Sequence, residues 1–247
     1  MKKTIFFLAC LLIAAASATA QTYYRVHMTN GEVVKYEASE VSYIDFQVVK
    51  TVQPVDLGLS SGTLWSPVNL GANSEEESGD YYAWAETSTK ESFTTENYAY
   101  YYKENNVLKV TDIGTTNIAG MEAYDAATAQ WGNGWQMPTS EQFIELKSEC
   151  TSELVQINGI NGWRFTGPNG NSIFIPLAGR HYQKNAGEPS SLDNVNNYGY
   201  YRSANRDEYY ELKAESFYIG KGGMMKMNSF GRDGGHTIRP VKMVKTR

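Results

Sequence analysis

The chain of 247 residues has few of the side chains that build metal centres and redox sites. It contains two cysteines, Cys10 and Cys150, and three histidines in separate segments, His27, His181 and His236. Structural zinc is held by closely spaced Cys and His side chains, and no such spacing occurs here. We therefore expect neither a bound metal nor a cofactor.

The chain also lacks clustered positive charge. It carries 22 Lys and Arg against 27 Asp and Glu, and its formal net charge is −5. Proteins that bind nucleic acid concentrate Lys and Arg on one face, so nucleic acid is not an expected partner. The acidic run Glu75-Glu76-Glu77 is typical of a solvated loop rather than of a pair of catalytic carboxylates.

A membrane span, which needs about 20 consecutive apolar residues, is missing as well. The apolar run Ile5–Ala16 is shorter, follows Lys2 and Lys3, and precedes the small residues Ala18-Thr19-Ala20. This order is typical of a secretory signal peptide. We expect residues 1–20 to be removed and the protein to be exported to the periplasm, the cell surface or the medium.

After cleavage the expected mature protein begins at Gln21 and has a net charge of −7, because Lys2 and Lys3 are lost. Cys150 is then the single cysteine, so no intramolecular disulfide can form in spite of the oxidising compartment. We expect Cys150 at the end of a helix as a small buried apolar residue. Lipidation at Cys10 is the alternative to cleavage after Ala20.

Residues 21–50 predict a small β segment. Strands are expected at Tyr23–Met28 and Val33–Tyr36, joined by a turn that contains the hairpin signal Asn30-Gly31. Ser42–Phe46 is a third short apolar segment, and residues 47–54 are the expected linker. The main domain is expected to span residues 51–247.

The main domain is predicted to have an α+β fold, with two helices in its first half and mostly strands in its second. One helix is expected at Glu122–Trp131, and a capping box at Thr139–Gln142 begins the other. The strands are expected at 80–86, 163–166, 172–176, 198–203, 209–219 and 237–241. The five tryptophans are expected in the core, and Arg239 is expected to have a structural role.

Four phrases in fixed order carry a family resemblance: Val55–Trp65, Trp131–Thr139, Asn169–Pro176 and Thr237–Val241. Together they are similar to the Fibrobacter succinogenes major paralogous (FISUMP) domain of Bacteroidota, over residues 55–242. The resemblance implies a C-type-lectin-like fold, with two helices, a twisted antiparallel sheet and long loops, related to the formylglycine-generating enzymes. Those enzymes use a late cysteine pair, and this chain has no cysteine after Cys150.

In a lectin-like fold the ligand surface is carried by a long loop, here expected at residues 180–197. C-type lectins place Glu-Pro-Asn in this loop and Trp-Asn-Asp on the next strand when they bind calcium. This chain has Glu188-Pro189-Ser190 and then Tyr198–Ser203, so we expect no calcium dependence. The alternative is that oxygen atoms of Glu188, Asp193 and Asn194 bind calcium.

The composition of this region is rich in Tyr, Asn, Ser and Arg, as in adaptable recognition surfaces. We therefore expect a non-enzymatic recognition module that binds a glycan or an extracellular protein. The alternatives are a structural or adhesin-like component of the cell surface and, third, an enzyme, since sequence order leaves a Ser-His-Asp triad open. The expected ligand-binding residues are Arg180, His181, Tyr182, Glu188, Asp193, Asn194, Asn197, Tyr200, Arg202, Tyr209, Tyr210 and Arg232.

Overall fold

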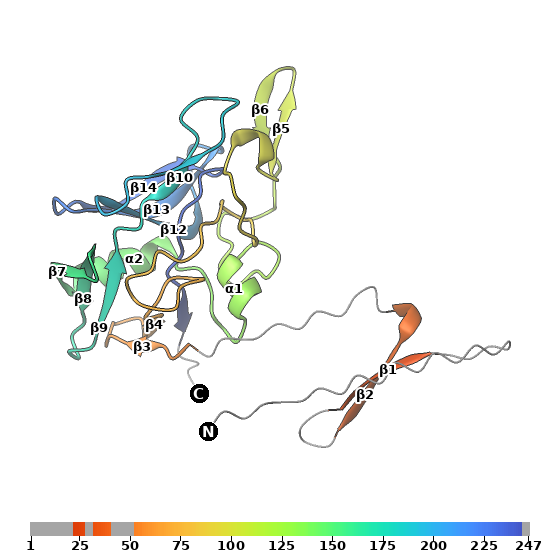
Figure 1. Cartoon of the computed structure of the whole chain (residues 1–247), viewed down its shortest axis with the longest axis horizontal. Coiled ribbons are helices and arrows are strands. Elements are labelled where there is room, and N and C mark those ends of the chain that lie inside the picture. The colour runs from red at the N-terminus through yellow and green to blue at the C-terminus, as the bar shows by residue number, and fades with distance from the viewer. Residues whose placement is uncertain (1–21, 28–31, 41–51, 244–247) are drawn as a thin grey trace. The chain divides into compact units, whose positions relative to one another are not determined.

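The computed structural model describes residues 22–27, 32–40 and 52–243 (Figure 1). The chain divides into two compact units, Met1–Val49 and Lys50–Arg247. No helix in the described ranges is long and apolar enough to span a membrane. The expected signal peptide, the segment Ser42–Phe46 and the first part of the linker lie outside the described residues.

The first unit contains an antiparallel pair, β1 (Tyr23–His27) and β2 (Val33–Glu37), with Tyr23 opposite Glu37. A short 3₁₀ turn, η1 (Ala38–Glu40), follows β2. The predicted pairing is therefore confirmed, although its turn at residues 28–31 is not described. A two-stranded hairpin is marginally stable by itself in water, so we expect the described pair of strands to have a further packing partner.

The main unit is β-rich, with two helices in its described part, α1 (Ala126–Trp131) and α2 (Ser140–Glu149). This agrees with the expected α+β class. Its strands are β3 (Val55–Asp56), β4 (Thr63–Trp65), β5 (Tyr101–Glu104), β6 (Val107–Val110), β7 (Thr151–Ile157), β8 (Ile160–Thr166), β9 (Ser172–Pro176), β10 (Arg180–Tyr182), β11 (Ser191–Asp193), β12 (Tyr198–Arg206), β13 (Lys213–Gly220), β14 (Met225–Gly231) and β15 (Val241–Met243). A second 3₁₀ turn, η2 (Thr95–Asn97), precedes β5.

The two helices begin where side chains cap them. The predicted capping box is confirmed, because the Thr139 hydroxyl accepts from Gln142 N while the Gln142 side chain accepts from Thr139 N. Helix α1 begins four residues later than predicted. Its N-cap is Asp125, whose carboxylate accepts from Thr128 N at 2.9 Å. Residues 122–124 form a backbone turn before this N-cap.

Three three-stranded antiparallel sheets form the body of the main unit, in the orders β12-β13-β14, β7-β8-β9 and β15-β4-β3. Helix α2 packs on β12, β13, β14 and β7, and the Phe143 ring stacks on Phe217 at 5.0 Å. Strand β15 pairs with β4 by placing Val241 opposite Trp65, which joins the two ends of this unit. Strands β8 and β9 contain the predicted strands 163–166 and 172–176 and pair as an antiparallel hairpin.

Several predicted strands are corrected by the structure. Residues 80–86 form only an isolated bridge, Tyr82 with His236. The strand predicted from Tyr209 begins at Lys213, because the Asp207 carboxylate accepts the amides of Tyr209 and Tyr210 and holds them in a turn. Strands β5, β6, β7, β10, β11 and β14 lie outside the predicted strands, and the strand predicted at 237–241 is present only from Val241, the first residue of β15.

The core contains the large aromatic side chains. Trp65, Trp84, Trp131 and Trp135 are buried as expected, whereas Trp163 is half-buried and donates to the Gly220 carbonyl oxygen at 3.2 Å. Cys150 is the C-cap of α2 and packs half-buried against a core cluster. Arg239 is fully buried and donates to the carbonyl oxygens of Ser66 and Phe174, which agrees with its expected structural role.

Candidate ligand-binding pocket

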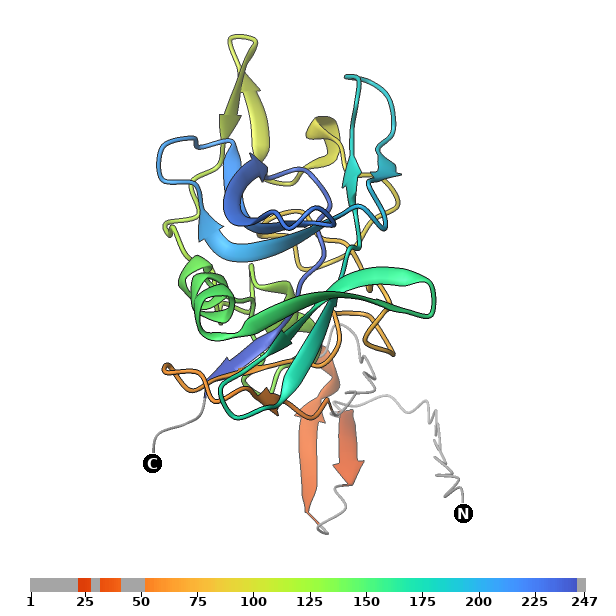
Figure 2. The same ribbon diagram turned by 90° about the vertical axis from the view of Figure 1, so that its left-hand side faces the viewer.

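The segment 180–197 is a hairpin rather than an unstructured loop. Strands β10 and β11 pair antiparallel, with Arg180 opposite Asp193 and Tyr182 opposite Ser191. Figure 2 shows this hairpin projecting from the same end of the main unit as the β5–β6 hairpin. At its base, His181 exchanges backbone hydrogen bonds with Gly235. This contact places β10 beside the segment that follows β14.

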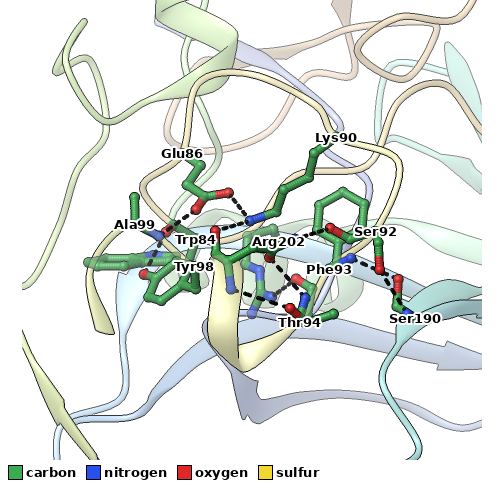
Figure 3. Close-up of polar contacts among 12 residues, drawn as sticks. Trp84, Glu86, Lys90, Ser92, Phe93, Thr94, Tyr98, Ala99, Ser190 and Arg202 are labelled. Carbon is green, nitrogen blue, oxygen red and sulfur yellow. Dashed lines mark hydrogen bonds and ion pairs between the residues drawn. The ribbon is translucent and has the colours of Figure 1, made fainter. Parts of the chain in front are cut away.

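The hairpin is also tied to the segment 86–99. Ser190 N donates to the Ser92 hydroxyl at 2.9 Å, and Phe93 N donates to the Ser190 hydroxyl at 2.8 Å (Figure 3). Farther along, Thr95 N donates to the Gln183 side-chain oxygen at 3.2 Å. These contacts join residues about 90 positions apart, so the β10–β11 hairpin has a defined position on the domain.

The segment 86–99 has its own internal supports, also visible in Figure 3. The Glu86 carboxylate pairs with Lys90 at 2.7 Å and accepts Ala99 N at 2.8 Å. The buried Tyr98 hydroxyl donates to the Trp84 carbonyl oxygen at 2.8 Å. The segment 86–99, which contributes Phe93 and Thr95 to the pocket described next, is therefore held in place by its own contacts.

Strand β10, η2 and the segment 230–236 enclose a pocket of about 210 Å³, here named the hairpin pocket. Aromatic rings and polar groups of both charge signs line it. The lining residues are Phe93, Thr95, Arg180, His181, Tyr182, Gln183, Phe230, Gly231, Asp233, Gly234 and His236. A concave site with apolar walls and a few converging polar groups is the usual form of a small-ligand site.

Arg180 is held in this pocket by aromatic rings. Its guanidinium carbon lies 4.3 Å from the Tyr182 ring centroid, 4.6 Å from Tyr200 and 5.4 Å from Phe230. Among the described residues no carboxylate forms an ion pair with it, and its buried Nε has no hydrogen-bond partner. The rings fix the cation by cation–π attraction and leave it without a protein anion.

Both histidines of this region are held in the neutral form. His181 packs edge-on against Tyr81 at 4.9 Å, and burial lowers its pKa. His236 is fully buried and shares a 2.9 Å hydrogen bond with the Ser216 hydroxyl. Burial, with the nearby charges of Arg202 and Arg180, lowers the His236 pKa well below its ordinary value. Neither imidazole therefore supplies positive charge at neutral pH.

The floor of the pocket rests on a buried cation. Arg202 donates from Nη2 to the carbonyl oxygens of Gly231 and Gly234, at 3.1 and 2.6 Å. Burial lowers its pKa to about 10, so the side chain stays charged at neutral pH. Asp233 lies between Gly231 and Gly234 in the sequence, and its carboxylate accepts from the Thr95 hydroxyl at 2.7 Å. It is the carboxylate of the pocket lining.

The structure brings together part of the expected site. Arg180, His181 and Tyr182 line the hairpin pocket. Tyr200 is buried beneath Arg180, and its hydroxyl accepts from Asn194 at 3.3 Å. The remaining hairpin residues lie outside the pocket lining, with Glu188 and Asn197 exposed and Asp193 and Asn194 half-buried.

Four expected site residues are corrected. Arg202 and Arg232 are 0% and 3% exposed, so neither presents its side chain on an open face. Arg202 is buried because β12 is covered on both faces from Gly199 to Ala204, so neither direction leads a side chain to solvent there. Tyr209 and Tyr210 are exposed but lie with Leu108 and Leu212 in a different depression.

Several pocket residues were missed from the sequence. They are Phe93 and Thr95, Gln183, and Phe230 and Asp233, which come from three separate segments that no motif joins. Gln183 alone lies within the expected loop. The four family-like phrases and the lectin-type residues of the loop give no signal for the other four, because only the tertiary fold brings them to β10.

The described residues contain no group of three or more His, Cys, Asp and Glu able to hold a metal ion. Glu188 accepts from Asn185 at 2.9 Å and Asp193 accepts from Asn194 at 2.9 Å, so both carboxylates are engaged by amides. These contacts explain how the acidic hairpin residues are satisfied by the protein.

The sequence contains the phrase Gly58-Leu59-Ser60-Ser61-Gly62, which has the spacing of a hydrolase nucleophile elbow. In the structure it joins strand β3 to strand β4, whereas an elbow joins a strand to a helix. Ser61 donates its hydroxyl to Glu145, and Ser60 N donates to Glu149. These serines therefore contact the end of α2 rather than a histidine.

Comparison of the chain with protein-family models, with curated proteins and with solved structures found no match in any of the three.

Proposed function

We propose that this chain is an exported, non-enzymatic recognition module that binds a carbohydrate in the hairpin pocket. The observation that carries the proposal is the Tyr182 ring, which is 42% exposed at the pocket and stacked on the Arg180 guanidinium. An exposed aromatic face beside hydrogen-bonding groups suits a sugar ring, since its apolar face packs on the aromatic and its hydroxyls need polar partners.

The polar groups beside Tyr182 are of the kinds that sugar hydroxyls use. Asp233 and the Gln183 side-chain oxygen are acceptors, and Arg180 is a donor without a carboxylate partner in the described chain. The Gln183 amide nitrogen already donates to Glu96 and Glu188. The supports from Ser92 and Ser190 hold the hairpin in one position. A preformed site loses less conformational freedom on binding, which favours affinity.

The proposed architecture is C-type-lectin-like and the proposed family is the FISUMP domain. Four ordered phrases support this, together with the order of two helices followed by antiparallel sheets. Export is proposed from the signal-like residues 1–20. The intact mass of the secreted protein tests export, with a start at Gln21 expected and a lipidated species starting at Cys10 as the contrary result.

The proposed function is tested by screening the mature protein on a glycan array and titrating each hit. Tyr182→Ala should bind roughly 30-fold more weakly, since truncating an aromatic hot spot costs about 2 kcal/mol. Its stability should change by less than about 0.5 kcal/mol, because the residue is exposed. The matched control is Tyr102→Ala in β5, which removes a tyrosine of similar exposure, 48%, outside the pocket.

Binding of a glycan by wild type and by Tyr102→Ala, with loss in Tyr182→Ala, supports the proposal. Equal binding by all three proteins would move the site elsewhere. The absence of any hit on a broad array would favour a protein ligand, the second class expected for this surface.

A second candidate, an assembly component of the cell surface, is favoured by one other observation. Tyr209 is 82% exposed, and with Tyr210, Leu108 and Leu212 it lines an open depression away from the hairpin pocket. Large exposed apolar side chains gathered in one patch are typical of association surfaces. Sedimentation equilibrium of wild type and of Tyr209→Ser distinguishes this role, because only an assembly role predicts self-association that the substitution removes.

A further inference from the structure

A second pocket, separate from the hairpin pocket, lies where the segment after β6 meets the end of β12. Its volume is about 190 Å³, and it is here named the two-arginine pocket. Its walls are Val110, Thr111, Asp112, Ile113, Thr115, Arg206, Glu211 and Arg232. Arg232 follows Gly231 in the sequence, yet Gly231 lines the hairpin pocket. The chain therefore directs neighbouring residues into two different sites.

Arg206 contributes a guanidinium that the protein leaves unsatisfied. The residue is half-buried at the end of β12, after a register shift in that strand. Its Nε is buried and has no hydrogen-bond partner. Its backbone N donates to Thr116 O at 2.9 Å, which fixes the position of the chain but uses none of the side-chain donors. A buried donor without an acceptor costs free energy, which a ligand acceptor would recover.

Arg232 brings a second cation to the same pocket. Its guanidinium carbon lies 4.6 Å from the Trp84 ring centroid, and its Nε donates to Lys213 O at 3.4 Å. These contacts hold the guanidinium in one orientation. Burial lowers its pKa, and the nearby charge of Arg206 adds to this effect. The two cations are thus close enough to repel each other, and an anion between them would relieve that repulsion.

The two acids of the pocket do not cancel these charges by contact. The ion pairs of the described residues are Glu86 with Lys90 and Glu75 with Arg164. Asp112 accepts from Gly114 N at 2.9 Å, which directs one of its oxygens to its own turn. Glu211 is exposed in the loop before β13. Both acids therefore reduce the positive potential of the pocket, but neither forms an ion pair with Arg206 or Arg232.

We propose that the two-arginine pocket binds a small oxyanion, either free sulfate or phosphate or the same group as an ester on a larger ligand. The planar guanidinium fork matches the oxygen geometry of these anions and gives charge-assisted, often bidentate hydrogen bonds. Two guanidinium groups, of which one is clamped by Trp84 and the other has free donors, form such a site. This site is distinct from the hairpin pocket, so it stands or falls independently of glycan binding there.

The test is a titration of the ¹⁵N-labelled mature protein with sodium sulfate, at an ionic strength held constant with sodium chloride. Wild type should show saturable shifts of the Arg206 and Arg232 Nε–H signals and of amides 110–113. Sulfate also stabilises proteins by exclusion from their surface, but that effect does not saturate at one site. Phosphate and a sulfated monosaccharide, titrated in the same way, distinguish a free anion from an ester group.

Two substitutions should act in opposite directions. Arg206→Gln should weaken sulfate binding at least tenfold, whereas Glu211→Gln should tighten it by about threefold, because a repelling carboxylate near the anion is removed. The control Arg164→Gln removes an arginine that is paired with Glu75 outside the pocket. Its sulfate affinity should equal that of wild type. Amide spectra of each variant show that the domain is folded.

The proposal is overturned if wild type shows no saturable shifts at these residues, or if Arg206→Gln binds sulfate as tightly as wild type. Equal weakening in Arg164→Gln would mean that binding follows net charge alone. If Arg206→Gln fails to fold, the exposed Glu211→Gln variant decides, because unchanged affinity in that variant contradicts a site beside Glu211. Tyr182→Ala should keep full sulfate affinity, which separates this result from that for the hairpin pocket.

Discussion

The Arg202 Nη2 atom lies 2.6 Å from the carbonyl oxygen of Gly234, although the Arg202 side chain is entirely buried. No carboxylate pairs with this cation among the described residues, and its Nε and Nη1 have no partner. A buried, incompletely satisfied charge is costly. Its contribution is to fix the backbone of residues 231–234, which lines the hairpin pocket.

Arg202→Ala should therefore destabilise the domain. The substitution leaves the carbonyl oxygens of Gly231 and Gly234 without their donor and opens a cavity, and we expect a loss of about 2 kcal/mol or more in the free energy of unfolding. Urea unfolding followed by tryptophan fluorescence measures this. Arg164→Ala, at a partly exposed ion pair, should lose less than about 1 kcal/mol. Equal losses in both variants would contradict a structural role for Arg202.

Trp135→Ala should lose about 3 to 5 kcal/mol of unfolding free energy, because a large buried ring is removed. The Trp135 ring packs edge-on against Trp131 at 5.4 Å and carries Lys242 Nζ at 4.8 Å on its face. The same urea experiment measures the loss. The control is Tyr210→Ala, an exposed aromatic truncation that should change stability by less than about 0.5 kcal/mol. A small loss in Trp135→Ala would mean that the region collapses around the missing ring.

Stability should fall as the pH falls below the ordinary histidine pKa of about 6.5, in part because of His236. The pKa of His236 is depressed in the folded state, so the unfolded chain binds a proton that the folded chain refuses. Below pH 6.5 the unfolded state is thereby favoured, with a slope of at most about 1.4 kcal/mol per pH unit from this residue. Above pH 6.5 His236 is neutral in both states, so the domain keeps its full stability with respect to this residue.

The measurement is the free energy of unfolding between pH 7.5 and pH 5 for wild type and for His236→Asn. The variant should show the smaller dependence on pH, whatever its absolute stability, while His181 keeps its own contribution in both proteins. His27→Asn, at an exposed histidine of the first unit, serves as the control and should retain the wild-type slope. Identical slopes in wild type and His236→Asn would show that His236 becomes protonated without unfolding.

Thermal unfolding should not depend on calcium. Melting temperatures with added calcium and with a chelator should agree within about 2 °C, because a tight native-state site would raise the melting temperature by mass action. Glu188, Asp193 and Asn194 are the residues to substitute if a larger calcium-dependent shift appears. That shift would restore the alternative in which the hairpin holds a calcium ion.

Local signals made some elements predictable. The Thr139 and Gln142 side chains indicate the start of α2, and the turn residues 167–170 indicate the β8–β9 hairpin. Both signals can be read from the sequence because they act between neighbouring residues. Strand β7 has no such signal. It is mostly exposed and pairs along one edge of β8, so its apolar pattern is weak. Its pairing is decided by its neighbour rather than by its own sequence.

The site was predictable only in the part that one segment supplies. Arg180, His181 and Tyr182 are consecutive, whereas Phe93 and Asp233 reach the pocket through contacts with residues far along the chain. Nothing in the sequence indicates that an arginine is buried, so Arg202 and Arg232 are expected on the surface from the sequence alone. Their burial depends on carbonyl oxygens and on a tryptophan ring that only the fold supplies.

Two serine contacts anchor the β10–β11 hairpin to segment 86–99 and leave its tip free to vary in sequence. Between Gln183 and Ser190, the six residues 184–189 are all exposed. Asn185 donates to the Glu188 carboxylate within this tip, and the Glu188 carbonyl oxygen accepts from Gln183 at its edge. The anchoring lies outside the tip, at Ser92 and Ser190. Residues 184–189 can therefore be exchanged, shortened or lengthened at little cost to folding. The hairpin is a natural graft position, where new specificity can be introduced while the scaffold stays the same.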